Sequence, residues 1–401
     1  MRRRILFVAE AVTLAHVARP AALVDSIDDT RYEAYIACDP RSHALLTVPA
    51  ERTLSVASMP GQLFAHRLRH GQPLYDRPTL QSYVDADLEL IRRIRPDLVV
   101  GDFRLSLSVS ARVAGVPYAT ITNAYWSPYA RDKSVPLPVL SWTRYVPLRA
   151  AQRAFDLIWP TITTVHCRPL NQVRVQRGLP ALDPDLRRTY TDADHVLYAD
   201  IPDLYPVESA PATHHYLGPI LWSPPTELPT WWGDVPQDKP IIYATLGSSG
   251  ASQTLVTVLD ALADMDVSVI ASTAGGPPPS RRPRNAWIAP YLPGLMAASR
   301  AQLVICNGGS PTSQQAIDAG VPVVGICGNA DQLLNMRGLV AAGAGLMLRV
   351  DRMSARRLRD LVENALRNPA ARSAARIASL RSHALHYRET FANFLGQVLG
   401  P

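Results

Sequence analysis

The chain has 401 residues, more than one ordinary hydrophobic core organises, so we expect two domains. Apolar residues make up 47% of the chain and charged residues 19%, a balance that fits a soluble globular protein and excludes disordered and fibrous classes. The net charge of +7 rests on dispersed arginines without interleaved aromatic residues, so we do not expect a nucleic-acid-binding protein.

The cysteine pattern and the hydropathy of the sequence argue against further classes of protein. The four cysteines (Cys38, Cys167, Cys306 and Cys327) show no Cys-x-x-Cys spacing, which argues against a disulfide framework or a zinc site. No uninterrupted apolar run reaches about 18 residues, so no membrane-spanning helix is expected. The sequence therefore predicts a cytoplasmic protein, monomeric or homodimeric, for which peripheral contact with an anionic membrane stays open.

The first half of the chain alternates short apolar runs with segments of helical spacing. Four runs are expected as buried strands: residues 4–12, 32–38, 96–102 and 117–124. Between them, apolar residues recur at helical intervals in residues 15–27, 85–95 and 106–116. Such alternation predicts a mostly parallel sheet with helices on both faces. Residues 130–190, rich in Trp, Pro and Arg, are expected to form helical excursions joined by loops.

The second half repeats this alternation after a proline-rich linker, residues 217–236. Apolar runs return at residues 240–247, 267–273, 285–293, 302–307 and 321–327, with a helix expected over 252–265. A helix over 355–368 precedes one from about 370 to 399, which is expected to cross back to the first half. The fold class is therefore α/β, with two Rossmann-like parallel-sheet domains: residues 1–216 with about 385–401, and residues 237–384.

A strand, a glycine turn and a helix start follow one another in residues 303–312. Residues 303–305 are apolar, Gly308 and Gly309 form the turn, and a short helix is expected to begin near Pro311 and Thr312. The first backbone N–H groups of a helix have no partner inside the helix and attract anions. We therefore expect a phosphate-binding turn at this point.

Two neighbouring segments extend this predicted site. The run 321–327 leads into a polar loop holding Asp331, Gln332 and Asn335, which are expected to contact whatever the phosphate carries. A second turn, at residues 247–249, has neither the GK[ST] ending of a P-loop nor the GxGxxG pattern, so alone it is equally an ordinary turn. Ligands of open α/β sheets lie beyond the carboxyl ends of the strands, where such loops converge. A nucleotide sugar, which joins a diphosphate to a polar ring, fits this site.

Two titratable residues of the first half follow strands at one sheet edge. His16 comes just after the first strand, and Asp102 ends the strand 96–102. A carboxylate beside a histidine fixes the tautomer of the ring and raises its basicity, which equips it to remove a proton from an acceptor hydroxyl. The alternatives are structural, because a lone histidine more often belongs to the packing and Asp102 also suits a helix N-cap.

Asn123, Tyr125 and Trp126 follow a further strand at that edge. Aromatic walls suit planar or sugar-like substrates, so these residues line an acceptor pocket or, equally, pack within their own loop. His166 and the pair His214 and His215 have no partner at metal-ligand spacing and are expected to be surface or core histidines. The sequence shows no GxSxG motif and no Cys/His pairing that would indicate a hydrolase nucleophile.

On these residues the chain resembles the GT-B-fold glycosyltransferases that use nucleoside-diphosphate sugars, among them UDP-glycosyltransferases and bacterial macrolide and antibiotic glycosyltransferases. Their donor signature, HGGxGTxxEAL…GVPxxxxPxxxDQxxNA, corresponds to NGGSPTSQQAIDAGVPVVGICGNADQLLNM at residues 307–336, with GVP and DQxxN intact. Their N-terminal GHVxR or GHVxP corresponds to LAHVARPAAL at residues 14–23, and residues 96–128 resemble their acceptor-domain segment. The resemblance spans nearly the whole chain in the family's order, and it implies two facing domains with a central cleft.

The resemblance also implies a role for each matching residue. His16 would be the general base and Asp102 its orienting partner, while residues 289–294 would flank the nucleobase. The implied donor-binding residues are Gly247, Ser248, Ser249, Tyr291, Leu292, Asn307, Gly308, Gly309, Ser310, Thr312, Gln315, Asp331 and Gln332.

Three positions depart from the signature. Asn307 replaces the histidine, so the phosphate loses a cation whose charge-assisted hydrogen bond is worth about 1.5–3 kcal/mol. Pro311 replaces the second-turn glycine and donates no N–H. Gln315 replaces the glutamate that grips the ribose. These changes imply an altered donor such as a dTDP-sugar, a slower enzyme, or a lost activity.

The resemblance implies an inverting, metal-independent glycosyltransferase without a further cofactor. Its UDP- or dTDP-linked co-substrate would pass a sugar to a hydroxyl, or to a nitrogen or carbon nucleophile, on a small-molecule acceptor. One alternative is another nucleotide-sugar enzyme of this fold, such as a 2-epimerase, which would need extra carboxylates in the cleft. The other is a non-catalytic donor-binding partner protein.

Overall fold

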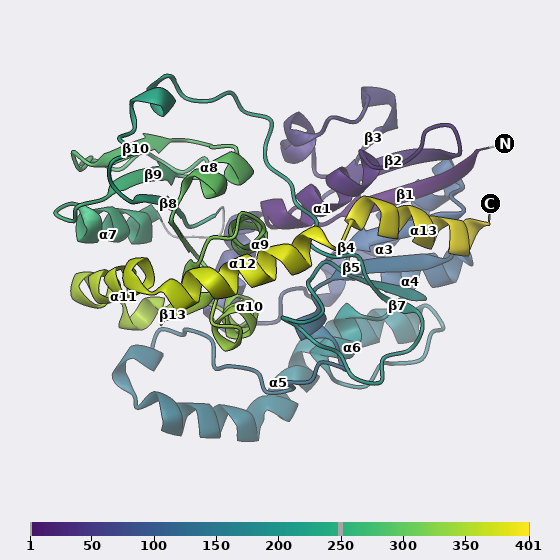
Figure 1. Ribbon diagram of the computed structural model, residues 1–401. Coiled ribbons are helices and arrows are strands. Elements are labelled where there is room, and N and C mark those ends of the chain that lie inside the picture. The colour runs from purple at the N-terminus through teal and green to yellow at the C-terminus, as the bar shows by residue number, and fades with distance from the viewer. Residues whose placement is uncertain (1, 248–251, 401) are drawn as a thin grey trace. The chain divides into compact units, whose positions relative to one another are not determined.

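The computed structural model describes residues 2–247 and 252–400. Within them the chain forms two compact units. The first comprises Met1–Ser134, Gln152–Ile220 and Leu385–Pro401, and the second comprises Val135–Ala151 and Leu221–Ala384. Each unit is built on one parallel sheet with helices on both of its faces (Figure 1). The predicted α/β class with two parallel-sheet domains is confirmed.

The first unit contains a seven-stranded sheet in the order β3-β2-β1-β4-β5-β6-β7. Its strands are β1 (Arg3–Ala9), β2 (Tyr32–Cys38), β3 (Thr53–Ser55), β4 (Leu98–Asp102), β5 (Tyr118–Thr122), β6 (His195–Tyr198) and β7 (His214–Tyr216). Its helices are α1 (Leu14–Val24), α2 (Gly61–Arg69), α3 (Arg77–Ile94), α4 (Leu107–Ala114), most of α5 (Leu148–Gln176), α6 (Leu186–Tyr190) and α13 (Tyr387–Leu399).

Strand alternation explains why this sheet is covered twice. Leu6 and Val8 pack with residues of α3 and α4 in one cluster, whereas Phe7 points the other way and contacts Phe391 of α13. Successive side chains of a strand face opposite sides, so an uninterrupted apolar run needs cover on both. The register pairs Ala9 with Asp102 and so brings the carboxyl ends of β1 and β4 level.

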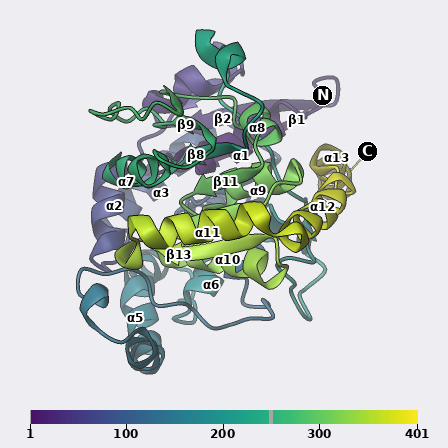
Figure 2. The same ribbon diagram turned by 60° about the vertical axis from the view of Figure 1, so that its left-hand side comes forward.

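The second unit contains a six-stranded sheet in the order β10-β9-β8-β11-β12-β13. Its strands are β8 (Ile241–Thr245), β9 (Ser268–Ser272), β10 (Ala286–Ala289), β11 (Leu303–Cys306), β12 (Val323–Cys327) and β13 (Gly345–Arg349). Its helices are α7 (Ser252–Leu262), α8 (Gly294–Arg300), α9 (Ser310–Asp318), α10 (Ala330–Ala341), α11 (Ala355–Arg367) and α12 (Pro369–His383). Apolar residues of α7 and α11 pack on one face of the sheet, and Figure 2 shows α11 and α12 following one another along this unit.

Two expected elements differ in the structure because of local packing and capping. The expected polar loop around Asp331 is the start of α10, whose first turn is closed by a capping box between Asn329 and Gln332. The expected single helix from about 370 to 399 is two helices, α12 and α13. The helix is interrupted around Leu385, which packs closely on Gly218. A Cβ added to Gly218 would lie 2.7 Å from the Leu385 Cβ.

Residues 130–190 contain helices joined by loops, as expected. They contain the 29-residue helix α5, which runs through both Pro160 and Pro169. Buried Phe155, Cys167 and Leu170 anchor its inner face, so tertiary packing outweighs the cost of two prolines. The segment Val135–Ala151 groups with the second unit instead of the first, where Arg349 donates to the Leu137 carbonyl at 2.6 Å.

Candidate active site

His16 and Asp102 meet at the carboxyl edge of the first sheet, as their places after β1 and β4 predict. The His16 Nδ1 lies 2.8 Å from Asp102 Oδ1. The Asp102 side chain is fully buried, whereas 18% of the His16 side chain is exposed. The ring therefore connects a buried carboxylate to the surface of the unit.

Arg19, one turn of α1 after His16, completes this pair and was not singled out by the sequence. Its Nε donates to Asp102 Oδ2 at 2.7 Å and its Nη2 to Asp102 Oδ1 at 2.8 Å. Burial lowers the pKa of Arg19 and the Asp102 charge raises it, with a net rise above the ordinary value. The available signal was its spacing from His16, since residues three apart on a helix share a face.

Arg19 also connects the pair to Asn123. Its Nη1 donates to Asn123 Oδ1 at 3.0 Å, and Asn123 Nδ2 donates to Asp200 Oδ1 at 2.9 Å. Asp200, just beyond β6, also accepts from the Ala124 N–H. Asn123 is therefore a buried connector, and its proposed contact with an acceptor stays a prediction.

Phe103 supports the His16 ring from one side. The two rings are stacked with centroids 4.7 Å apart and planes 12° from parallel. Phe103 has a φ of +56°, a left-handed conformation that is strained for a bulky side chain. Such strain persists only where surrounding contacts hold the residue, and the Phe103 ring contacts Phe64, Tyr75 and Tyr190.

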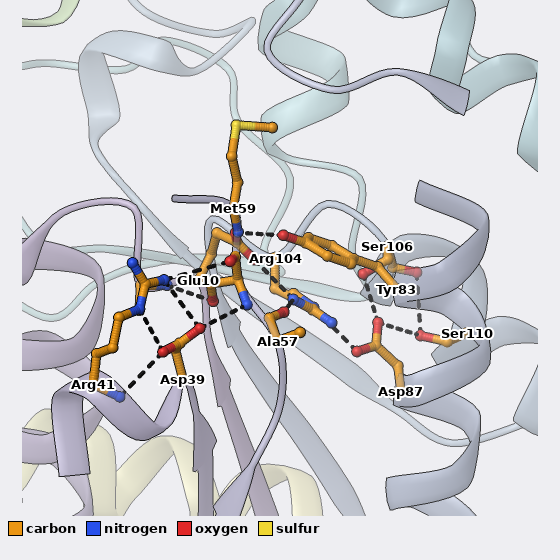
Figure 3. A network of polar contacts seen from close by, with 12 residues as sticks. Glu10, Asp39, Arg41, Ala57, Met59, Tyr83, Asp87, Arg104, Ser106 and Ser110 are labelled. Atoms are coloured by element: carbon orange, nitrogen blue, oxygen red, sulfur yellow. Dashed lines mark hydrogen bonds and ion pairs between the residues drawn. The ribbon is translucent and has the colours of Figure 1, made fainter. Parts of the chain in front are cut away.

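Arg104, the residue after Phe103, is held between two buried carboxylates. Figure 3 shows its guanidinium between Glu10 and Asp87, to which it donates at 2.8 Å and 3.1 Å. Its guanidinium carbon also lies 3.7 Å from the centre of the Tyr83 ring. Burial raises the pKa of Glu10 and of Asp87, and the Arg104 charge opposes that rise. This network joins Glu10, which follows β1, to the loop after β4 and to α3.

An aromatic wall extends from Phe103 within the same unit. Phe103 contacts Tyr190 at 5.6 Å between centroids, and Tyr190 contacts Trp126 edge-on at 5.3 Å. Trp126 is half-buried, whereas Tyr125 is buried against Tyr205. Trp126 is therefore partly accessible next to this series of rings, whereas Tyr125 packs beneath it. Contact of either residue with an acceptor stays a prediction.

The second unit contains the glycine turn. Gly308 has a φ of +80°, and a Cβ there would lie 2.5 Å from Cys327 Sγ. Helix α9 begins at Ser310, with Gly309 as its N-cap and a proline in its first turn. The first-turn N–H groups of Ser310 and Thr312 therefore lie at the positive end of the helix.

Asn335 and Gln332 fix this turn from α10. Asn335 Nδ2 donates to the Gly308 carbonyl at 2.8 Å and to Ser313 Oγ at 2.9 Å. Gln332 Oε1 accepts from the Gly328 N–H at 2.8 Å. Gln332 and Asn335 of the DQxxN motif thus have structural roles, and the contacts of Asp331 and Gln332 with a sugar stay predictions.

The remaining expected donor residues lie around the same sheet edge. Gly247 follows β8 with a φ of +63°, while Ser248 and Ser249 lie outside the described residues. After β10, Leu292 is buried and Tyr291 is 39% exposed. Tyr291 lies against Gly275, where a Cβ would stand 2.3 Å from its hydroxyl. Tyr291 is the more available of the two for a ligand.

Comparison with known proteins identifies the family. Residues 256–386 match the model of the erythromycin biosynthesis protein CIII-like C-terminal domain. The PGL/p-HBAD biosynthesis rhamnosyltransferase of Mycobacterium bovis (strain BCG / Pasteur 1173P2) is 51% identical over 94% of this chain and 84% of that protein. The chain is a GT-B glycosyltransferase of the UDP-glycosyltransferase-like family.

Two further similarities bear on this glycosyltransferase. The solved structure of the spinosyn rhamnosyltransferase SpnG complexed with thymidine diphosphate shares its fold, with a TM-score of 0.68 and 18% identity over 98% of this chain and 99% of that chain. An inactive PGL/p-HBAD biosynthesis glycosyltransferase of the same M. bovis strain is 49% identical over 65% of this chain and 71% of that protein.

The departures from the family signature have structural counterparts in this glycosyltransferase. Asn307 Oδ1 accepts from the Gly309 N–H at 3.0 Å, an Asx-type turn that stiffens the glycine loop. Gln315 Nε2 donates to the Trp222 carbonyl at 2.6 Å, and its amide packs against Gly294. Both neutral side chains are therefore used in holding the loops together.

Proposed function

We propose that this glycosyltransferase moves a rhamnose-type deoxysugar from a dTDP-linked donor to a hydroxyl group on a ring-bearing small-molecule acceptor, with inversion at the anomeric carbon. His16 is the general base and Asp102 orients it. The observation that carries the proposal is the buried Asp102 carboxylate hydrogen-bonded to the His16 ring.

The tautomer of His16 follows from this contact. A carboxylate only accepts hydrogen bonds, so at 2.8 Å the His16 Nδ1 is the donor and carries the proton. In the neutral ring the lone pair then belongs to Nε2. That atom takes the acceptor's proton while the acceptor oxygen attacks the anomeric carbon. The proton comes to rest on Nε2, and the resulting imidazolium is stabilised by the carboxylate.

Arg19 acts on the base through Asp102 as a positioning residue. Its two hydrogen bonds to the carboxylate fix the plane of the oxygens, and its charge balances the buried anion. The carboxylate therefore stays an acceptor toward His16. The third hydrogen bond, to Asn123, couples this arrangement to the loop that precedes Trp126.

The donor side of the proposal rests on the glycine turn. The first turn of α9 offers N–H groups and the positive end of the helix dipole to a diphosphate, whose charge grows as it leaves. Asn307 brings no positive charge here. The thymidine nucleotide is proposed because the structural neighbour SpnG is complexed with thymidine diphosphate, and rhamnose because the M. bovis relative is named a rhamnosyltransferase.

The acceptor class is proposed from the wall beside His16. Phe103, Tyr190 and Trp126 form a continuous series of ring contacts next to the base. Aromatic faces bind planar rings and the apolar faces of sugars. An aromatic hydroxyl is also easier to deprotonate than an aliphatic one, since the pKa of the tyrosine hydroxyl is about 10.

A two-part experiment tests this function. Thermal unfolding is followed with dTDP, dTDP-rhamnose and UDP-glucose, and transfer from the same donors to a panel of phenols and phenol glycosides is followed by mass spectrometry. We expect dTDP-rhamnose to raise the melting temperature and to give a product whose anomeric configuration, measured by NMR, is inverted. Retained configuration, or transfer from UDP-glucose alone, would contradict the proposal.

A second candidate, donor binding without transfer, is favoured by two observations. Asn307 replaces the cationic signature residue, and one relative of 49% identity is named inactive. This candidate predicts that dTDP-rhamnose raises the melting temperature while no acceptor in the panel is glycosylated. The same experiment therefore separates the two functions.

A further inference from the structure

The outward face of helix α5 carries apolar side chains where a solvated helix carries polar ones. Leu157 is 83% exposed, Ile158 54% and Val165 50%. The spacing places Ile158 and Val165 on the side of α5 opposite the buried Cys167 and Leu170, with Leu157 about a quarter turn from them. Burying an exposed leucine or isoleucine is favourable, so this face is available for contact with an apolar medium.

Basic side chains lie on either side of this apolar stretch along α5. Exposed Arg153 and Arg168 precede and follow the stretch from Leu157 to Val165. Within α5 the one acidic residue is Asp156, and the chain as a whole has a net charge of +7. Arginine side chains can extend past an apolar surface and keep the guanidinium at a polar boundary.

We infer that α5 lies along an anionic lipid surface, with Leu157, Ile158 and Val165 entering the boundary between headgroups and acyl chains. Arg153 and Arg168 then contact lipid phosphates. An apolar stripe with cationic flanks is the pattern of an interfacial helix. Among the described residues no helix is long and apolar enough to cross a bilayer, so the contact is with its surface. This inference is independent of the proposed donor and base.

The charge pattern favours a lipid surface over a protein partner. Protein interfaces concentrate their binding energy in exposed tyrosine and tryptophan anchors, and the exposed large apolar side chains of α5 are aliphatic: Leu157, Ile158, Val165 and Val175. Each basic side chain near an anionic membrane adds attraction that salt weakens. Binding is therefore expected to need anionic lipid and to fall as the salt concentration rises.

Sedimentation with sucrose-loaded vesicles tests the inference. The full chain is incubated with vesicles of phosphatidylcholine alone or of equimolar phosphatidylcholine and phosphatidylglycerol. We expect it to sediment with the mixed vesicles only, and Leu157→Ser/Ile158→Ser to bind about tenfold more weakly, because two apolar anchors are lost. Arg153→Gln/Arg168→Gln is expected to lower both the binding and its salt dependence.

The matched control is Ile377→Ser/Leu380→Ser on α12, where the two side chains are 53% and 71% exposed. The control is expected to bind vesicles like the unmodified chain, and all variants to melt at unchanged temperatures because the altered side chains are exposed. Absence of sedimentation with mixed vesicles, or an equal loss in the control, overturns the inference. So does a chain that self-associates in gel filtration through Leu157 and Ile158 while ignoring vesicles.

Discussion

At the scale of single residues, we propose that the ion pair of Arg19 with Asp102 holds the carboxylate that orients His16. Removing the guanidinium in Arg19→Met leaves the Asp102 charge unbalanced and removes a cation whose Nη2 lies 3.2 Å from His16 Nδ1. Both changes favour the protonated ring. We expect kcat to fall and the acid limb of the pH profile of kcat/KM to move to higher pH.

Arg19→Lys is the conservative comparison, since it restores the charge without the paired hydrogen bonds. It is expected to return the acid limb toward its original position while kcat stays reduced. A merely structural role for Arg19 would lower the amount of folded protein and leave the pH profile in place. Stabilisation by dTDP, which is proposed to bind the second unit, serves as the folding control.

The buried ion pairs of Arg104 contribute to the free energy of unfolding. Arg104→Met leaves Glu10 and Asp87 fully buried without their cation, and breaking a buried pair in this way costs about 3–5 kcal/mol. Denaturant unfolding measures the loss. The control Arg92→Met removes an ion pair in which Arg92 is 77% exposed, and it is expected to change stability by less than about 0.5 kcal/mol. Equal effects would show that burial is not the cause.

The sequence predicted the residues that end strands and missed those that act through tertiary contact. His16 and Asp102 each follow an apolar run, and parallel strands bring such ends to one edge. The only local signal of Arg19 is its spacing from His16, and Phe103 carries no local signal for its role. The partner of Arg19 lies 83 positions away, and the Phe103 ring, whose backbone is left-handed, contacts residues as distant in the chain as Phe64 and Tyr190.

At the scale of elements, the glycine turn before α9 combines a special backbone with close packing. Gly308→Ala places a Cβ at a φ of +80°, 2.5 Å from Cys327 Sγ and 2.8 Å from Met336 Cγ. The conformation and the clash together are expected to cost about 2–4 kcal/mol. The neighbouring Gly309 has a φ of −73°, so Gly309→Ala is expected to cost far less. Urea unfolding of the two variants compares them, and equal losses would contradict this account of the turn.

Element boundaries show the limits of pattern reasoning. The start of α10 was mistaken for a loop because its polar residues are capping groups, and the Asn-x-x-Gln spacing of Asn329 and Gln332 was the signal that could have found it. Helix α5 could not be predicted through Pro160 and Pro169 from local preference, since packing of its inner face holds it. Short strands such as β7 contain too few residues to show a period.

At the scale of the whole molecule, histidines divide unevenly between the units. Of the ten histidines, only His383 lies in the second unit, so histidine-linked acid sensitivity belongs to the first. Burial, and then the neighbouring His215, lower the pKa of His214 to about 4. The pKa of a histidine in the unfolded chain is about 6.5. Between these values the unfolded state binds more protons, so stability is present above about pH 6.5 and is lost as the pH falls toward about 4.

His214→Phe removes this titration and is expected to make the melting temperature of the first unit less sensitive to acid between about pH 7 and about pH 5. The other titrating groups are the same in both proteins, so the comparison isolates His214. His386→Gln, at an exposed side chain of the same unit, is the control for the loss of one histidine. An unchanged slope in His214→Phe would place the acid sensitivity elsewhere.

The most direct test of the proposed mechanism is the turnover of His16→Ala with dTDP-rhamnose and an accepted phenol, measured beside stabilisation by dTDP. The proton acceptor is lost while the glycine turn of the second unit is untouched. We predict that kcat falls by at least about 10²-fold and that dTDP raises the melting temperature as it does in the unmodified chain. Unchanged turnover in His16→Ala would contradict the account.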